Sequence, residues 1–445
     1  MKRTLQRKAT QELSVAEKIY LLRKQNRTTQ AVLAEAMRAR PEKIVRVERG
    51  EDEYTQAQIN AAKKHFDIVD LPLTERESIA FKERLYYWHS LLKARKLDEA
   101  KAIHNEMINI DSLKTCDYHM VTLCKMIAVY QILVEEDYIC AEEKLSEHQD
   151  FLYKMNAENL YHYYKCKGFL CLHKGGYEEG LNLYLKAYDL LENCENIIPE
   201  DDERLYYNIA YCYSYLEFPY RAIFFFQKAR HAQADNKNID FFLNIDRSLA
   251  LNYIKMNQLK EAERLLNRCS LKAESIKNSN STNLVLLCFG YMYKKANNWP
   301  LAINHFDEAI KRFPNDSDNY YSSLYHKIQC VIHARAFSEA KHLLLQTKEF
   351  YSSNEMWVTY FTALGHYLKI SSNMSTNTNS ESVEYIENTA IPYLIKNNDY
   401  FLAIDYYTIL ENHYEKINSI KKSLLMAKAI RDIYLRCYTN HRRDD

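Results

Sequence analysis

The spacing of apolar and polar positions predicts a chain built of helices. In the segment 283–314, large apolar side chains recur at helical intervals, at Leu287, Tyr291, Ile303, Phe306 and Ile310. The whole chain contains only 7 Gly and 7 Pro in 445 residues, and the tight turns between strands consume both residue types. We therefore expect an all-α fold of long helices joined by short connections.

Three series of small residues repeat along most of the chain. The first series, Gly168, Ala210, Ala250, Gly290 and Cys330, has intervals of 42, 40, 40 and 40 residues. The second is Gly180, Ala222, Ala262, Ala302 and Ala340, and the third is Ala187, Ala229, Cys269, Ala309 and Thr347. A helix can approach another closely only where side chains are small, so the series predict hairpins of two antiparallel helices stacked on one another.

This arrangement resembles the tetratricopeptide repeat, and we expect a right-handed superhelix with a concave inner surface. A large residue precedes or opens each second helix, at Tyr177, Tyr220, Leu259, Trp299 and Phe337. Weaker copies are expected upstream, around Trp88/Ala100 and Ala128/Ala141, and downstream, around Leu410/Lys422/Ala429. The polar stretch 371–382 is interpreted as a loop.

The N-terminal segment has the pattern of a helix-turn-helix. Helices are expected over 16–25, from Thr28 or Thr29 to Met37, and over 41–49, where Pro41 suits the first helical position and Gly50 ends the helix. A further helix is expected over 55–66.

The same segment resembles the lambda-repressor/Cro-like helix-turn-helix family. The resemblance rests on Ile19, Leu22 and Arg23, on the T-Q-x-x-L-A motif from Thr29 to Ala34, and on V-E-R-G from Val47 to Gly50. It implies that the DNA-binding residues are Gln30, Arg38, Arg40, Glu42, Lys43 and Arg46, with Gln30 at the DNA backbone and the last four along the major groove. Pro41 and Glu42 depart from the usual residues of such repressors, so Lys43 and Arg46 either read bases, bind phosphates only, or remain solvated.

Charge supports a nucleic-acid partner for this segment. Residues 1–50 contain 13 Lys or Arg and 5 Asp or Glu, a net charge of +8, whereas the whole chain has a net charge of +1. A basic head on an acidic body is typical of DNA-binding proteins. We divide the chain into a helix-turn-helix domain at 1–66, a linker at 67–78 and a repeat domain at 79–445.

Polar residues on the first helix of each hairpin are candidates for ligand binding. Those chosen as peptide-binding residues are Lys165, Asn208, Tyr211, Asn244, Arg247, Asn252, Tyr291 and Lys294. An Asn amide can pair with both groups of a peptide unit, and Arg or Lys can hold a carboxylate. The alternative for each residue is a solvated side chain; it is less favoured for Asn208 and Asn252, which stand among apolar residues.

A helix-turn-helix followed by such repeats resembles the Rap/NprR/PlcR-type peptide-pheromone receptors. The stretch Ser248–Ala262 is the most similar, and the resemblance assigns a peptide-backbone contact to Asn252. It implies quorum sensing: a short signalling peptide binds the repeats and changes the arrangement of a homodimer and its affinity for double-stranded DNA.

Other classes of function are disfavoured by the sequence. No stretch is apolar enough to span a membrane, and the 11 Cys are dispersed, as expected of reduced, buried thiols, so we expect a cytoplasmic protein. No catalytic or metal-binding motif is present, and we expect no cofactor and no enzymatic activity. Two alternatives stay open: a regulator that acts on a protein partner, as Rap-type proteins act on response regulators, and a phage-type peptide communication receptor.

Overall fold

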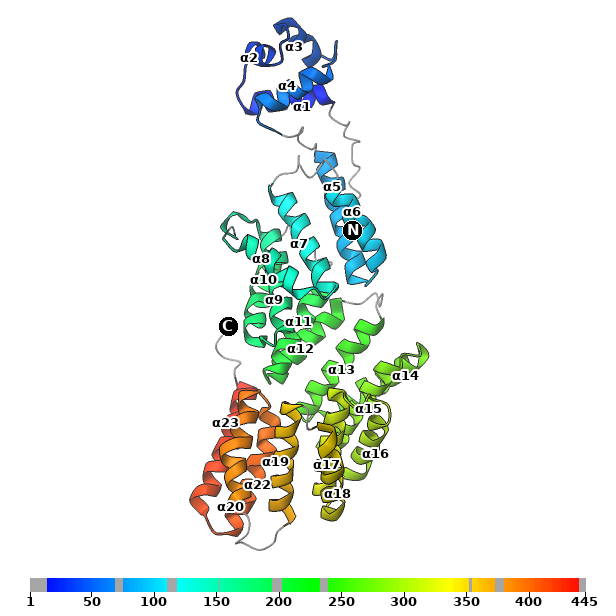
Figure 1. The fold of residues 1–445 in the computed structure, drawn as a ribbon, viewed down its shortest axis with the longest axis vertical. Coiled ribbons are helices and arrows are strands. Elements are labelled where there is room, and N and C mark those ends of the chain that lie inside the picture. The colour runs from blue at the N-terminus through cyan, green and yellow to red at the C-terminus, as the bar shows by residue number, and fades with distance from the viewer. Residues whose placement is uncertain are drawn as a thin grey trace, which may run out of the picture. The chain divides into compact units, whose positions relative to one another are not determined.

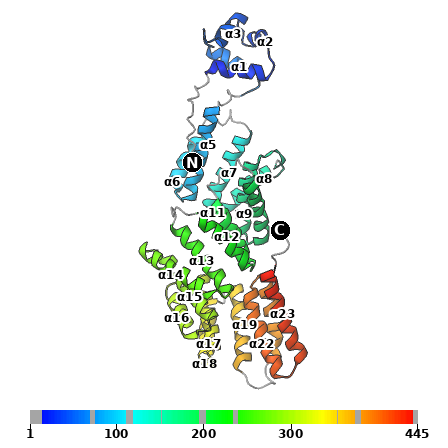
Figure 2. The same cartoon turned by 180° about the vertical axis from the view of Figure 1, so that it is seen from behind.

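The computed structural model describes residues 14–68, 75–109, 118–150, 152–193, 202–232, 239–351, 354–372 and 380–439. Every regular element in these ranges is a helix, which confirms the all-α prediction (Figures 1 and 2). The chain divides into two compact units. The first lies within 1–173 and 186–197, and the second within 174–185 and 198–445.

Four helices form the N-terminal part of the first unit, which we call the head. They are α1 (Val15–Gln25), α2 (Gln30–Ala36), α3 (Pro41–Glu48) and α4 (Gln56–His65). Of the two candidate caps, Thr29 is the N-cap of α2, and its side chain accepts a hydrogen bond from the Val32 N–H at 3.2 Å. Pro41 opens α3, and Ile44 and Val47 are buried, as the sequence predicts.

The rest of the first unit continues with paired helices. They are α5 (Glu75–Lys93), α6 (Leu97–Asn109), α7 (Tyr118–Val134), α8 (Tyr138–Gln149) and α9 (Ala157–His173), with a short 3₁₀ helix at Leu152–Lys154. Trp88, Ala100 and Ala141 are fully buried and Ala128 is half-buried where α5 packs on α6 and α7 on α8, which confirms the two upstream helix pairs. Because α5 begins at Glu75, the last four residues of the predicted linker 67–78 are helical.

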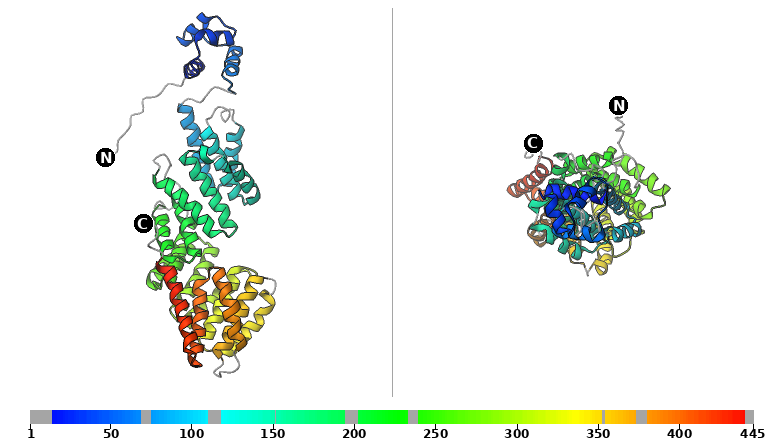
Figure 3. Two further views of the ribbon diagram at one scale, coloured as in Figure 1. Left: turned by 90° about the vertical axis from the view of Figure 1, so that its left-hand side faces the viewer. Right: turned by 90° about the horizontal axis from the view of Figure 1, so that it is seen from above.

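Four helical hairpins follow one another in the second unit (Figure 3). They pair α11 (Asp202–Tyr215) with α12 (Pro219–Ala232), α13 (Ile239–Lys255) with α14 (Leu259–Ser275), α15 (Ser279–Lys295) with α16 (Trp299–Ile310), and α17 (Asp318–His333) with α18 (Phe337–Tyr351). Helix α10 (Tyr177–Asn193) is shared between the two units. Each first helix contacts the next first helix as well as its own partner. The first helices therefore form one layer of the unit and the second helices another; the right-handed superhelix remains a prediction.

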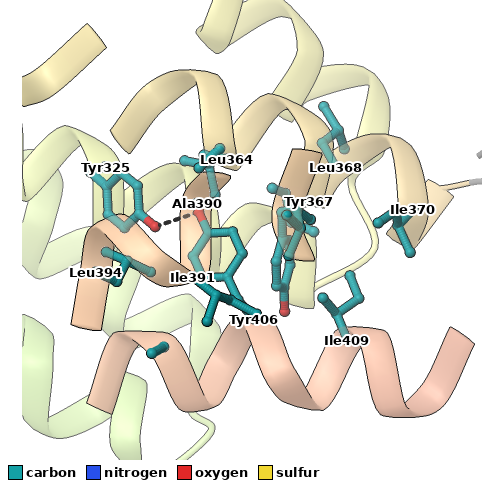
Figure 4. Close-up of a cluster of buried hydrophobic side chains, with 14 of the residues drawn as sticks. Tyr325, Leu364, Tyr367, Leu368, Ile370, Ala390, Ile391, Leu394, Tyr406 and Ile409 are labelled. Carbon is teal, nitrogen blue, oxygen red and sulfur yellow. Dashed lines mark hydrogen bonds between the residues drawn. The ribbon is translucent and has the colours of Figure 1, made fainter. Parts of the chain in front are cut away.

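The C-terminal helices complete the second unit. They are α19 (Glu355–Ser372), α20 (Ser380–Tyr385), a π-helical segment (Ile386–Ala390), α21 (Ile391–Lys396), α22 (Tyr400–Lys416) and α23 (Ile420–Thr439). The predicted loop 371–382 is shorter than expected, because its two ends continue α19 and begin α20. Figure 4 shows the core in which these helices pack against α17. The hydroxyls of Tyr325 on α17 and Tyr406 on α22 are 2.9 Å apart there.

Helix α23 also contacts α12, near the beginning of the second unit. The guanidinium of Arg436 lies 5.4 Å from the ring of Phe218, which precedes α12, and 3.9 Å from the ring of Tyr400. Residues more than two hundred positions apart in the sequence are thus in contact.

The three series of small residues are buried at every position. Gly290 shows why size matters there. A Cβ at this position would stand 2.5 Å from Cε1 of the Phe306 ring, and Phe306 is itself fully buried. The forty-residue period is therefore a period of close helix contacts.

Each of the five turns before α10, α12, α14, α16 and α18 uses one residue with positive φ, two positions before the helix begins. These residues are Gly175 (φ 75°), Glu217 (59°), Asn257 (57°), Asn297 (58°) and Arg335 (61°). At Asn257, its N–H donates to Ile254 O at 3.0 Å and the next N–H donates to Tyr253 O at 2.8 Å. This is the hydrogen-bond pattern that ends a helix with a left-handed residue. Four of the five turns do so without glycine, which explains how a chain with 7 Gly forms so many of them.

Candidate functional sites

Helix α3, which holds three of the residues predicted to lie along the major groove, and the turn before it present a basic surface. Arg38 is exposed in a left-handed conformation (φ 51°), and Arg40 is exposed at the N-cap position, where its side chain makes no capping bond. Glu42 and Arg46 are exposed, and Lys43 is half-buried. The structure thus brings these five predicted DNA-binding residues together around one short helix.

Gln30 has a different environment from the other five. Its amide Nε2 donates to Glu48 at 2.6 Å, and the same carboxylate accepts two hydrogen bonds from the Arg23 guanidinium, at 2.6 and 2.8 Å. Arg23 and Glu48 are almost fully buried, and Arg23 also donates to Thr28 O at 3.1 Å. The amide of Gln30 is therefore engaged in a buried network that joins α1, α2 and α3.

Asp52 was not among the residues selected from the sequence. Its Oδ1 accepts a hydrogen bond from Lys43 Nζ at 2.6 Å, and its Oδ2 accepts one from Arg46. These two bonds hold the pKa of the Asp52 carboxyl well below its usual range. The signal in the sequence was the acidic run Glu51–Glu53 directly after the glycine that ends α3.

Three of the predicted peptide-binding residues lie on α13. Asn252 is fully buried, and its Nδ2 donates to Ser214 Oγ at 3.0 Å and to Ser248 O at 2.8 Å, whereas its Oδ1 has no hydrogen-bond partner. Arg247 donates to Asn244 Oδ1 at 3.2 Å. The unpaired Oδ1 of Asn252 can accept a hydrogen bond, and the Arg247 guanidinium can bind an anion. A peptide ligand offers a partner for each group.

The charge of Arg247 is not balanced by a nearby acid. The side chain is half-buried, and no carboxylate forms an ion pair with it in the part of the chain that the structure describes. Neighbouring cations differ in this respect: Arg268 and Arg230 both pair with the buried Asp246, and Lys255 pairs with Glu217 at 2.9 Å. Because a half-buried cation is costly without a counter-charge, Arg247 is the strongest candidate for an anionic group of a ligand.

Asn208 and Tyr211 lie on α11, and Tyr211 belongs to a row of aromatic rings. Tyr207, Tyr211 and Tyr215 follow one another along the helix with ring centroids 6.1 and 4.9 Å apart, and Tyr177 stacks on Tyr215 at 4.1 Å. The Nδ2 of Asn208 donates to the hydroxyl of Tyr184 at 3.1 Å. Burial raises the pKa of the Tyr211 hydroxyl above its usual range, so this hydroxyl is uncharged at neutral pH.

Tyr291 and Lys294 on α15 are engaged with other helices. The hydroxyl of Tyr291 is 2.7 Å from Ser322 Oγ. Lys294 Nζ donates to Gln329 Oε1 at 2.6 Å and lies 3.6 Å from a carboxylate oxygen of Asp405. Lys294 therefore already has a counter-charge, and a ligand carboxylate would compete with Asp405 for it.

Lys165 lies on α9 in the first unit, whereas the other seven residues belong to the second unit. Its Nζ lies 4.8 Å from the centroid of the Tyr161 ring. The nearby His162 is buried, and burial, together with the charges of Lys165 and Lys82, lowers the pKa of its imidazole to about 3. This imidazole is neutral at physiological pH.

Three further properties of the described residues concern membranes, metal ions and cysteines. No helix within the described ranges is long and apolar enough to cross a membrane. The same ranges hold no group of three or more His, Cys, Asp or Glu arranged as metal ligands. Most cysteines in these ranges are buried, as the sequence predicts, and burial raises the pKa of the Cys166 thiol to about 12.

Comparison with known proteins identifies the fold. No protein-family model and no curated protein sequence matches the chain. Among solved structures, the apo form of the quorum sensor NprR from B. thuringiensis is 18% identical, with a TM-score of 0.61 over 79% of this chain and 98% of that one. A Rap protein complexed with competence and sporulation factor is 12% identical, with a TM-score of 0.62 over 81% and 99%. NprR in complex with its cognate peptide NprX is 19% identical, with a TM-score of 0.59 over 80% and 99%. The chain therefore has the fold of the NprR and Rap proteins over about four fifths of its length.

Proposed function

We propose that this chain, which shares the fold of NprR and Rap, is a cytoplasmic transcriptional regulator switched by a peptide. The head binds double-stranded DNA through α3, and a short signalling peptide binds along the first helices of the second unit. One observation carries the proposal. The head exposes Arg38, Arg40 and Arg46, and the same chain has the fold of NprR, a protein that binds the peptide NprX. Residues 1–50 have a net charge of +8, which favours DNA as the partner of the head.

The peptide would shift the balance between two arrangements of the second unit. It can do so only if it binds one arrangement more tightly than the other. We also propose a homodimer, because two heads about one helical turn apart would engage two halves of one DNA site. Analytical ultracentrifugation of the protein with and without peptide tests whether the chain forms a homodimer.

The DNA-binding function predicts that Arg40 contributes to affinity. Arg40→Gln in the full chain is expected to weaken binding to operator fragments about tenfold, since a lost phosphate or base contact costs on the order of 1–3 kcal/mol. Gel shifts or fluorescence anisotropy measure this effect. Arg264→Gln removes the same charge from an exposed position on α14 and should leave binding unchanged. Equal effects of the two substitutions would contradict a DNA-binding role for the head.

The peptide-binding function predicts a pairing between Arg247 and a carboxylate of the ligand. The probes are short synthetic peptides from the C-termini of small exported proteins encoded beside the gene, each made as the free acid and as the amide. Arg247→Gln is expected to weaken binding of the acid about 10- to 100-fold, as expected for a charge-assisted hydrogen bond. Isothermal titration calorimetry should show that the wild-type protein binds the amide as weakly as the variant binds the acid. If the variant discriminated between acid and amide as strongly as the wild type, Arg247 would not hold the carboxylate.

A second candidate is a regulator that acts on a protein partner, and the similarity to the Rap protein favours it. The Arg40→Gln variant separates the two functions in cells. A regulator that works through DNA has a weaker effect on its target genes in this variant, whereas one that works through a protein partner keeps its full effect.

A further inference from the structure

The chain reverses direction directly after α3, and this reversal brings Asp52 back onto the helix. Gly50 adopts φ 78°, a conformation that favours glycine. The N–H of Gly50 donates to Val47 O at 3.0 Å, and the N–H of Glu51 donates to Arg46 O at 2.9 Å. These two bonds end the helix and fix the position of the residue that follows.

Both oxygens of the Asp52 carboxylate are occupied by groups of the head. Oδ1 accepts from Lys43 Nζ at 2.6 Å and from the Glu53 N–H at 2.8 Å. Oδ2 accepts from Arg46. One acidic side chain thus pairs with both cations of α3, Lys43 and Arg46.

A phosphate group has the same chemistry as this carboxylate toward lysine and arginine. DNA phosphates would therefore compete with Asp52 for the charges and hydrogen-bond donors of Lys43 and Arg46. Pairing within the protein also reduces the number of counterions that DNA releases on binding, which is the main source of non-specific affinity.

We propose that Asp52 determines the DNA specificity of the head by acting as an internal competitor of DNA phosphates. The proposal rests on the DNA-binding function proposed above. Non-specific duplexes, which offer only phosphates, gain little from displacing the carboxylate. A duplex whose bases bind Lys43 or Arg46 gains enough to displace it, so the ratio of specific to non-specific affinity increases.

The test compares Asp52→Asn with Glu51→Gln in the full chain. Asn keeps the size of Asp52 and an acceptor for the Glu53 N–H but removes the charge. Glu51→Gln removes one negative charge at the adjacent, exposed position, so it controls for the change in net charge. Circular dichroism verifies that both variants fold. If Asp52→Asn does not fold, Asp52→Ser, which also keeps an acceptor, takes its place.

The probe is a short, labelled duplex of random sequence, titrated at a series of KCl concentrations. Asp52→Asn is expected to bind it about tenfold more tightly at low salt, and the slope of log K against log [salt] should become steeper by about 1–2, because two cations each release about 0.9 counterion. Glu51→Gln should change both quantities much less.

Equal shifts in the two variants would overturn the role of Asp52 and leave the DNA-binding function intact. Absence of binding by the wild type and both variants at low salt would instead overturn the DNA-binding function, and the role of Asp52 with it.

Discussion

Replacing Gly290 with alanine is expected to lower the free energy of unfolding of the second unit by about 1–3 kcal/mol, the usual cost of overpacking a core. The new methyl group would stand 2.5, 2.7 and 2.9 Å from three atoms of the Phe306 ring. The ring is fully buried, so a shift of the ring would disturb the side chains packed around it. Urea denaturation followed by far-ultraviolet circular dichroism should show a lower midpoint for the variant.

Gly365 provides a matched control for this substitution. It also lies within a helix, α19, but a Cβ there would meet no atom within 4 Å. Gly365→Ala is expected to stabilise the protein by about 0.5–1 kcal/mol, because alanine has the higher helix propensity. Phe306→Leu should relieve part of the strain in Gly290→Ala, so the double variant should be more stable than the sum of the single effects predicts. Similar midpoints for both alanine variants would refute the close-contact explanation.

Replacing Asp399 with asparagine is expected to stabilise the protein at neutral and mildly alkaline pH. Asp399 is the N-cap residue of α22 and accepts a hydrogen bond from Tyr360. Burial, followed by the charge of Glu217, raises the pKa of the Asp399 carboxyl to about 7, and Lys255 opposes this rise. Burial raises the pKa of Glu217 as well, against the effects of Lys255 and Arg436.

The direction of the pH effect follows from proton binding. The pKa of Asp399 is higher in the folded protein than the ordinary value of 3.8, so the folded state binds more protons than the unfolded chain between about pH 4 and pH 7. Stability therefore falls as pH rises through this window. The free energy of unfolding that is lost across this window is a few kcal/mol, because each pKa unit corresponds to about 1.4 kcal/mol.

The measurement is the thermal unfolding midpoint at several pH values between about 4 and 8. The wild-type midpoint should fall across this range, and the Asp399→Asn profile should be flatter. Asp316→Asn, at an exposed position, should keep the wild-type profile. A wild-type profile in the Asp399 variant would show that another group causes the pH dependence.

Helices and their contacts could be predicted from the sequence because the information is periodic. The small residue at Gly290 and its counterparts at Ala250 and Ala210 mark the same contact in successive hairpins. Left-handed turn residues were harder to identify, since Glu217 and Arg335 have no preference for that conformation.

The chemistry of the candidate sites was less predictable, because it depends on contacts between distant residues. Lys294 looks available in the sequence, but Asp405, more than a hundred residues later, lies 3.6 Å from it. Conversely, Arg247 looks like any other basic residue, and only the absence of a carboxylate around it in the described ranges distinguishes it. The sequence shows Asp52 as an acidic residue close to α3, but it does not show that its carboxylate pairs with both Lys43 and Arg46.

The contact between α23 and α12 has a consequence for local unfolding. A stack of repeats in which each unit touches only its neighbours loses structure most readily at its last helix. Here Arg436 anchors that last helix to Phe218, at the beginning of the unit. Amide hydrogens of α23 should therefore exchange with solvent about as slowly as those of the central hairpins, rather than at the fast rate of a frayed end.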